Sequence, residues 1–192
     1  MAWTKGLNFR AISTVVTDGA DETYVQADPY PTVRNVSTFG WLSNTSTIQV
    51  RDRSTTVDRR LVGLHFTEAS TGASFQIDLP SSGDYLIRAA YGDGANPQTI
   101  NISLLDDGVV FSSVTGDAGA NQFFDAAGVL RTAAEWPSSN TSLSRTFSTT
   151  SLILRINSTA VASYGVAHLF LDQVVQGGGA PQRVWRDVVR RA

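Results

Sequence analysis

The stretch from Phe75 to Val114 limits the folds available to this chain more than any other part of it. Phe75, Ile77 and Leu79 alternate with polar residues, which is the period of two expected of a strand with one face in water. Turns rich in glycine, aspartate, proline and serine then interrupt the stretch three times, the last at Asp106-Asp107-Gly108, a strong hairpin pattern. The pattern predicts four short strands in a central meander of an antiparallel β-sandwich.

Segments of the same kind fill the chain up to residue 176. The most apolar of them, Gly165–Val175, is expected to be the final, central strand. Glu135–Asn140 is expected to be a loop that carries an exposed tryptophan, Trp136. The whole pattern predicts an all-β fold over residues 1–176, an antiparallel sandwich of the jelly-roll type with about ten strands and no amphipathic helix.

Length and charge narrow the classes of protein further. A chain of 192 residues is suited to one domain with a substantial core. Its net charge of −2 does not favour nucleic acid or a membrane as partner. The absence of cysteine excludes disulfides, a thiolate nucleophile and cysteine-based zinc sites. The first residues lack the apolar run of a secretory signal, so we expect synthesis in the cytoplasm without export by that route.

The last residues differ in kind from the rest. Residues 177–181 form a glycine-rich linker, and residues 182–192 form a basic, amphipathic tail that is either helical or extended. The tail is a free end, a clip onto its own domain, an anchor onto a neighbouring subunit, or a binder of nucleic acid or membrane. The anchor hypothesis assigns the interface to Arg183, Val184, Trp185, Arg186, Val188, Val189 and Arg190.

The densest run of charge lies between Arg51 and Arg60, where arginine and aspartate alternate. One interpretation is a set of partly buried arginine–aspartate pairs that hold a long loop onto the sandwich, because the two groups pair bidentately. The other interpretation is a site for an anion or for sugar hydroxyls. The run itself does not decide between them.

Patterns for catalysis are weak. The sequence has no Gly-x-Ser-x-Gly nucleophile motif, and its two histidines, His65 and His168, both lie within strand patterns. Strands bring distant residues together, so a pair of carboxylates for glycoside hydrolysis stays open. No supporting pattern surrounds any glutamate, and we predict a protein that is not an enzyme.

Several motifs resemble the galactose-binding-like or malectin-like jelly roll that is found beside polysaccharide-degrading modules. The resemblance covers about residues 6–176. Its motifs, in chain order, are Thr38–Trp41, Arg51–Ser54, Arg60–Phe66, Phe75–Pro80, Gly83–Tyr85, Tyr91–Asp93 and Phe123–Leu130. The opening Gly6–Arg10, followed by Thr17–Ala20, is also similar to virion structural proteins of tailed bacteriophages.

A sugar-binding module of this class implies aromatic rings that stack on sugars, with polar side chains that bond their hydroxyls. The candidates for these roles are Trp41, Tyr91, Trp136, Asp93 and Asn96. The alternative for each aromatic is packing in the core or within a loop. Such modules often hold calcium at a loop, for which the weak candidates are Asp18, Asp21, Asp106 and Asp107; no other cofactor or metal is expected.

Two functions are therefore expected from the sequence. The first is a non-enzymatic phage virion protein, a capsid decoration or head/tail-associated component. It would form homo-oligomers or bind capsid or tail proteins through its C-terminal tail. The second is a stand-alone carbohydrate-binding module that recognises a cell-surface or polysaccharide glycan. Exposure of Trp41, Tyr91 and Trp136 separates the two, because a stacking platform must face the solvent.

Overall fold

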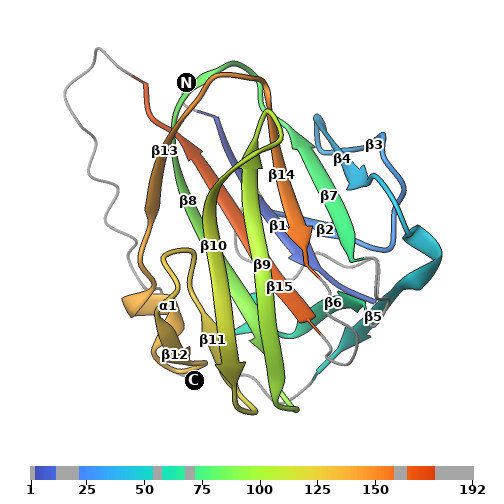
Figure 1. Ribbon diagram of the computed structural model, residues 1–192, viewed down its shortest axis with the longest axis vertical. Helices are drawn as coiled ribbons and strands as arrows, with labels where there is room; N and C mark the ends of the chain where they lie inside the picture. Colours follow the sequence, from blue (N-terminus) through green and yellow to red (C-terminus); the bar gives the residue numbers. More distant parts are fainter. Residues whose placement is uncertain (1–2, 12–21, 54–57, 68–71, 158–163, 176–192) are drawn as a thin grey trace, which may run out of the picture.

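The protein folds into two β-sheets packed face to face, with short helical turns at their edges (Figure 1). The computed structural model describes residues 3–11, 22–53, 58–67, 72–157 and 164–175. Within these ranges, no helix is long and apolar enough to cross a membrane. The prediction of an all-β sandwich is confirmed.

The larger sheet has nine strands and the smaller one has six. The larger sheet comprises β1 (Thr4–Phe9), β2 (Glu22–Val25), β5 (Ile48–Asp52), β6 (Gly63–Thr67), β8 (Gly83–Asp93), β11 (Gln122–Phe124), β12 (Leu130–Thr132), β13 (Leu143–Phe147) and β15 (Tyr164–Gln173). The smaller sheet comprises β3 (Thr32–Arg34), β4 (Ser37–Trp41), β7 (Ala73–Asp78), β9 (Gln98–Asp106), β10 (Val109–Ala118) and β14 (Ser151–Ile156). The helical turns are η1 (Thr45–Thr47), η2 (Arg59–Leu61) and α1 (Trp136–Ser139).

The four strands predicted within Phe75–Val114 are present as β7, β8, β9 and β10, but they do not form one meander. β8 belongs to the larger sheet, whereas the other three belong to the smaller one. Only β9 and β10 pair with each other, through a turn in which Asp107 and Gly108 have φ angles of 50° and 75°. From Ala89 onward every residue of β8 is buried, because the core between the sheets covers one face, with Ala89 and Tyr91, and the outer cluster under α1 and η2 covers the other at Ala90.

β15 is the central strand of the larger sheet, as the sequence predicts. It pairs antiparallel with β8, β1 and β6. One pair departs from the antiparallel prediction, because β1 and β2 run parallel. The described residues form fifteen strands rather than about ten, and β3, β11 and β12 among them have only three residues each.

Alternate residues of both sheets point into one apolar core. Phe75 on β7 meets Phe9 on β1 across this core, with ring centroids 5.1 Å apart, and both side chains are fully buried. The opposite, outer face of the larger sheet carries a second, smaller apolar cluster, where α1 and η2 cover the sheet. Its members are Leu61, Ala90, Phe123, Ala133, Trp136 and Ala167.

The charged run between Arg51 and Arg60 is largely a set of ion pairs. Arg10 Nε lies 3.3 Å from Asp52, Arg53 Nη2 lies 2.8 Å from Asp93, and Arg60 Nη2 lies 2.6 Å from Asp58. The interpretation that arginine–aspartate pairs hold this segment onto the sandwich is confirmed for its described residues. Residues 54–57 lie outside them.

His65 on β6 lies inside the core rather than at a surface. Its ring centroid is 5.3 Å from that of Phe9 and 6.0 Å from that of Trp41, and its Nε2 lies 3.2 Å from the carbonyl oxygen of Arg10. Burial lowers the pKa of His65 to about 4, against the smaller opposite effect of its bond to Arg10.

His65 should make stability depend on pH. An unfolded histidine has a pKa near about 6.5, so between that value and about pH 4 the unfolded state binds a proton that the folded state does not. The contribution of His65 to the free energy of unfolding is therefore complete above about pH 6.5 and decreases as the pH falls below that value. From pH 8 to pH 5 we expect the free energy of unfolding to fall by about 2 kcal/mol. Urea denaturation at the two pH values measures it.

His65→Gln is the matched variant, because glutamine keeps a polar side chain without the titration. The carboxyl groups of Glu22 and Asp58, whose pKa values are lowered in the fold, contribute acid sensitivity to both proteins. The variant should therefore lose less stability than the wild type between pH 8 and pH 5. Equal losses in the two proteins would show that His65 is not the group responsible.

Candidate functional site

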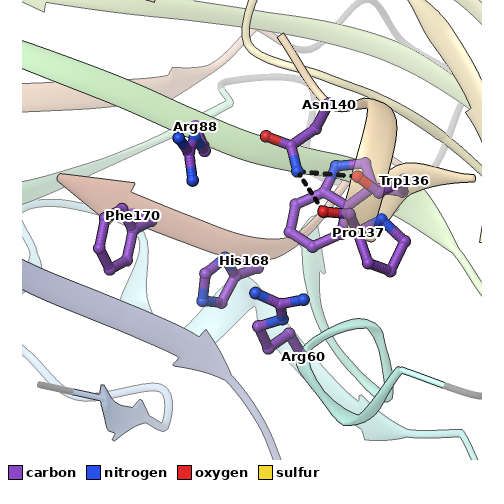
Figure 2. Close-up of a pocket in the computed structure, with 7 residues that line it drawn as sticks. All are labelled: Arg60, Arg88, Trp136, Pro137, Asn140, His168 and Phe170. Carbon is purple, nitrogen blue, oxygen red and sulfur yellow. Dashed lines mark hydrogen bonds between the residues drawn. The ribbon is translucent and has the colours of Figure 1, made fainter. Parts of the chain in front are cut away.

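A pocket lies on the outer face of the larger sheet, between η2 and α1 (Figure 2). Its floor is the central part of the sheet, where Phe170 on β15 is in register with Arg88 on β8, and His168 is in register with Ala90. The full lining is Arg60, Arg88, Trp136, Pro137, Asn140, His168 and Phe170.

Trp136 builds one wall of the pocket and anchors α1 to the sheet. Its ring Nε1 donates to the carbonyl oxygen of Ala89 at 2.8 Å, and its ring meets that of His168 edge to face at 5.8 Å. The side chain is only 1% exposed. The predicted loop with an exposed tryptophan is therefore wrong, because the indole has both apolar neighbours and a hydrogen-bond acceptor beneath α1.

Arg60 enters the pocket from η2, on the other side. Asp58 caps this turn by accepting from the Arg60 backbone N–H at 2.8 Å, and it also accepts from the Arg60 side chain at 2.6–3.2 Å. Burial alone would raise the pKa of Asp58, but its hydrogen bonds and the charge of Arg60 outweigh burial and lower it. The guanidinium carbon of Arg60 lies 5.2 Å from the centre of the Trp136 ring, within reach of a cation–π contact.

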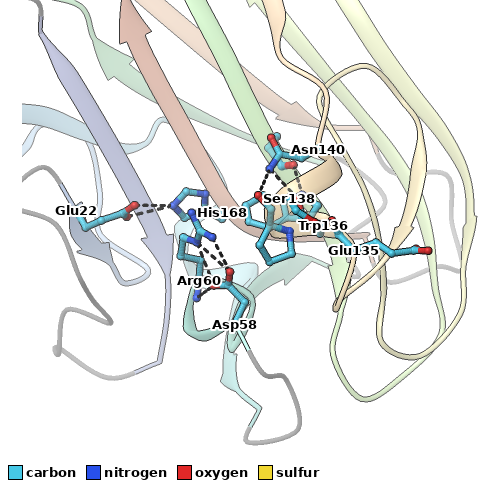
Figure 3. Close-up of polar contacts among 10 residues, drawn as sticks. Glu22, Asp58, Arg60, Glu135, Trp136, Ser138, Asn140 and His168 are labelled. Carbon is cyan, nitrogen blue, oxygen red and sulfur yellow. Dashed lines mark hydrogen bonds and ion pairs between the residues drawn. The ribbon is translucent and has the colours of Figure 1, made fainter. Parts of the chain in front are cut away.

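His168 is held by a buried carboxylate behind the pocket (Figure 3). Its Nε2 lies 3.1 Å from Glu22 Oε2, which also accepts from Asn8. Burial would raise the pKa of Glu22, yet the charge and hydrogen bond of His168 prevail, with help from Arg60 and Asn8, and lower it. Gly6 makes this arrangement possible, since a Cβ there would lie 2.2 Å from Glu22 Cδ.

Asn140 and Arg88 complete the polar lining. Asn140 Nδ2 donates to the Trp136 carbonyl oxygen at 2.7 Å, so its amide is oriented with Oδ1 on the other side. That Oδ1 is buried and accepts no bond from the protein, which is unfavourable unless water or a ligand hydroxyl donates to it. Arg88 Nε donates to Ser142 Oγ at 3.0 Å and the side chain is half-buried.

The structure does not form the predicted aromatic platform. Trp41 and Tyr91 are each 1% exposed and belong to the core between the sheets, and Trp136 is equally buried. Asp93 is also buried and is taken up by bonds to Arg53 and to the Ala95 backbone N–H. The alternative interpretation, packing inside the protein, holds for all three rings: Trp41 and Tyr91 fill the core between the sheets, and Trp136 packs in the outer cluster under α1.

Two of the five glycan candidates still have some contact with solvent or pocket. Asn96 lies in the exposed turn after β8, where its Nδ2 is 3.4 Å from Asp93 Oδ2. Trp136 lines the pocket from within the fold. These two residues lie on separate elements, and no described contact brings them together.

Of the four aspartates predicted as possible calcium ligands, Asp106 and Asp107 lie in the described residues. Asp106 accepts from Arg145, Ser148 and Thr149 at 2.9–3.0 Å, so donors already occupy its oxygens. Asp107 forms the tip of the β9–β10 turn. Asp18 and Asp21 lie outside the described residues, and within these residues no three histidine, aspartate or glutamate side chains gather as a metal site would require.

The proposed assembly interface, Arg183 to Arg190, also lies outside the described residues, as do the linker and the rest of the tail. The anchoring of the tail on a neighbouring subunit and a location in a virion stay predictions from the sequence.

The pocket-lining residues that sequence patterns missed are Arg88, Pro137, Asn140 and Phe170, and they also missed Glu22 behind the lining. For His168, the sequence predicts a position within a strand and no role in a site. Alternation along β15 does place His168 and Phe170 on one face, so the pattern carried part of the information. It did not say which strands lie beside them.

Comparisons with known proteins place the fold. No model of a known protein family matches the sequence, and no curated protein matches it either. Among solved structures, the plant receptor-like kinase ANX2 is similar over 91% of this chain and 48% of its own, with a TM-score of 0.56 and 8% identity. The chain thus spans about half the length of that structure.

Two carbohydrate-binding modules are also similar, at lower scores. A family 35 module from Clostridium thermocellum matches 71% of this chain and 91% of its own, with a TM-score of 0.38 and 11% identity. A module of Cellvibrio mixtus lichenase 5A, solved with cellotriose, matches 68% and 89%, with a TM-score of 0.37 and 13% identity. The likeness to ANX2 shows a shared fold, in line with the jelly-roll sandwich that the sequence motifs indicate.

Proposed function

We propose that this chain is a non-catalytic glycan-binding domain, and that the pocket between η2 and α1 is where it contacts the sugar. A fold alone does not assign a function, so the pocket has to carry the proposal. Four polar side chains, those of Arg60, Arg88, Asn140 and His168, line one opening beside the apolar side chains of Trp136, Pro137 and Phe170. This is the combination that a sugar requires, with donors for its hydroxyls and apolar surface for its C–H groups.

The buried oxygen of Asn140 supports the same conclusion. Its Nδ2 is bonded to a backbone carbonyl, and its Oδ1 has no donor from the protein. A sugar hydroxyl both donates and accepts, so it matches this acceptor and the neighbouring guanidinium donors at the same time.

A binding role fits the state of the two histidines better than a catalytic one. His65 lies in the core, and His168 is 1% exposed and bonded to Glu22. The bond between Glu22 and His168 fixes the imidazole ring beside the pocket, which suits a binding site whose polar groups are held in place.

The experiment is a glycan array screen with the full chain, followed by calorimetric titration of each glycan that binds. We expect at least one glycan to bind, and we expect Arg60→Gln to weaken that binding by about tenfold or more, the loss of one charged hydrogen bond. Arg59→Gln is the matched control, because Arg59 is the exposed neighbour in the same turn and does not line the pocket.

Failure takes two distinct forms here. If no glycan binds, the proposed function is wrong. If a glycan binds and Arg60→Gln, shown to be folded by circular dichroism, binds it as well as Arg59→Gln does, the domain recognises sugars somewhere other than this pocket.

A further inference from the structure

The larger sheet ends at β2, on the side away from β1. Within the described part of the chain, no further strand pairs with β2 on that side. The carbonyl oxygen of Val25 points toward β1, because it accepts from the Arg10 backbone N–H at 2.8 Å. Successive carbonyls of a strand point to opposite sides, so those of Glu22 and Tyr24 point to the outer edge. Such an edge is a template for pairing with another chain.

Two side chains of the β3–β4 hairpin cover these two carbonyls. Arg34 Nη1 donates to the carbonyl oxygen of Tyr24 at 3.3 Å. Asn35 Nδ2 donates to the carbonyl oxygen of Glu22 at 3.4 Å. The hairpin lies at the same side of the sandwich as β2 (Figure 1). It therefore takes the place of a neighbouring strand, with side-chain N–H groups where a strand would supply backbone N–H groups.

Further contacts hold the hairpin in this position. Arg34 Nη2 donates to Asp28 Oδ1 at 2.7 Å, and the guanidinium carbon lies 4.3 Å from the centre of the Tyr24 ring. Lys5 on β1 is only 4% exposed, and its Nζ donates to the carbonyl oxygen of Asn35 at 3.0 Å. A buried ammonium group requires such an acceptor, so this bond fastens the turn of the hairpin to the larger sheet.

The turn of the hairpin is strained at Val36. Asn35 and Val36 have φ angles of 46° and 55°. A two-residue hairpin turn of this type requires a positive φ at both positions, which asparagine adopts readily and a β-branched residue does not. The Val36 side chain is 97% exposed, so no packing offsets the strain. A strained turn persists where its surroundings hold it, and here the bonds of Arg34 and Asn35 do so.

We propose that the β3–β4 hairpin is a strap that covers the outer edge of β2 and prevents a second copy of this chain from pairing with that edge. Arg34, Asn35 and Lys5 hold the strap closed, and the strain at Val36 weakens it. The strap acts on the association of the protein with itself and is independent of glycan binding.

The test uncovers the edge in the full chain with the double variant Arg34→Ala/Asn35→Gly. Glycine keeps the left-handed turn while it removes the amide that covers Glu22. Sedimentation velocity over a series of concentrations measures association, and circular dichroism shows that each variant is folded. We expect the double variant to associate about tenfold or more strongly than the wild type, because its β2 edge is free to pair.

Arg145→Ala is the matched control. Arg145 pairs with Asp106 at 2.9 Å and lies 4.8 Å from the centre of the Phe111 ring, so this variant loses the same two kinds of contact as Arg34→Ala. Its bond to Asp106 is to a side chain rather than to a carbonyl at a sheet edge. We expect Arg145→Ala to associate no more strongly than the wild type.

Two further variants examine the edge and the turn separately. Tyr24→Lys, added to the double variant, places a charge on the uncovered edge and should return association to the wild-type level. Val36→Gly keeps both covering side chains and relieves the strain. It should raise the Tm by about 2–4 °C and leave association unchanged.

The outcomes decide between the strap and its alternatives. If the double variant associates no more strongly than the wild type, the hairpin does not protect the edge and the inference is refuted. Equal association of Arg145→Ala and the double variant would trace the effect to lost stability, and association that survives Tyr24→Lys would trace it to another surface; both refute the strap. An unchanged or lower Tm for Val36→Gly would refute the strain at the turn. If the double variant does not fold, Asn35→Gly alone uncovers the Glu22 carbonyl and is judged in the same way.

Discussion

Replacing Trp136 by alanine should lower the free energy of unfolding by about 3–5 kcal/mol, the usual range for a buried tryptophan. The ring packs under α1 against the outer face of the larger sheet, and its N–H donates to the carbonyl oxygen of Ala89 at 2.8 Å. Its removal leaves a cavity and an unpaired acceptor together, and it takes away one wall of the pocket. Urea denaturation monitored by circular dichroism measures the loss.

Two further variants divide this effect into its causes. Trp136→Phe keeps most of the ring but not the N–H, so it should lose about 1–3 kcal/mol. Trp3→Ala removes a half-buried tryptophan that meets Tyr85 edge to face at 6.1 Å, and should have the smaller effect of the two alanine variants. Similar losses for Trp3→Ala and Trp136→Ala would mean that α1 is not packed on the sheet as described.

Replacing Asp93 by alanine should have a comparable effect, about 3–5 kcal/mol, because it breaks a buried ion pair from one side. The Asp93 side chain is fully buried and accepts from Arg53 at 2.8 and 3.1 Å, and from the Ala95 backbone N–H at 2.8 Å. Arg53 is 19% exposed, so water reaches part of its charge and we expect the lower end of that range. Thermal and urea unfolding measure the change.

The control for Asp93 is Asp117→Ala, which removes an exposed aspartate that accepts from Thr99 on the paired strand. This control should change stability by less than about 1 kcal/mol. The sequence predicts Asp93 as a glycan ligand. Under that prediction, Asp93→Ala would weaken glycan binding and have little effect on stability. If Asp93→Ala abolished glycan binding and left stability unchanged, the structural role assigned to Asp93 would be wrong.

Much of the fold was predictable because a strand can be recognised from the residues within it and in the turns beside it. Alternation and turn residues located β7 to β10, and the apolar run of Gly165–Val175 identified β15 as the central strand. The predicted meander failed at β8. The alternation of residues is the same whether a strand pairs with its neighbour in sequence or lies in the other sheet. For β8, only the burial of both faces at Ala89–Asp93 distinguishes the two arrangements.

The candidate site was predictable only in part. The charged run correctly indicated arginine–aspartate pairs, and among its described residues Arg60 alone lines the pocket. The aromatic candidates were chosen because turns and glycines surround them, and that pattern does not distinguish a ring that faces water from one that faces the core. Trp136 was identified for an exposure that it does not have.

The sequence by itself determined the class of fold, because period-two alternation and turn chemistry are properties of neighbouring residues. Tertiary structure alone decided which residues line the pocket. Glu22 and His168 are 146 positions apart, and they meet because β1 lies between β2 and β15 with Gly6 leaving room for the carboxylate. Arg60 and Arg88 likewise share one opening because η2 and β8 come together on one face of the larger sheet. Pairing between distant strands depends on the packing of the whole core, and no local pattern encodes it.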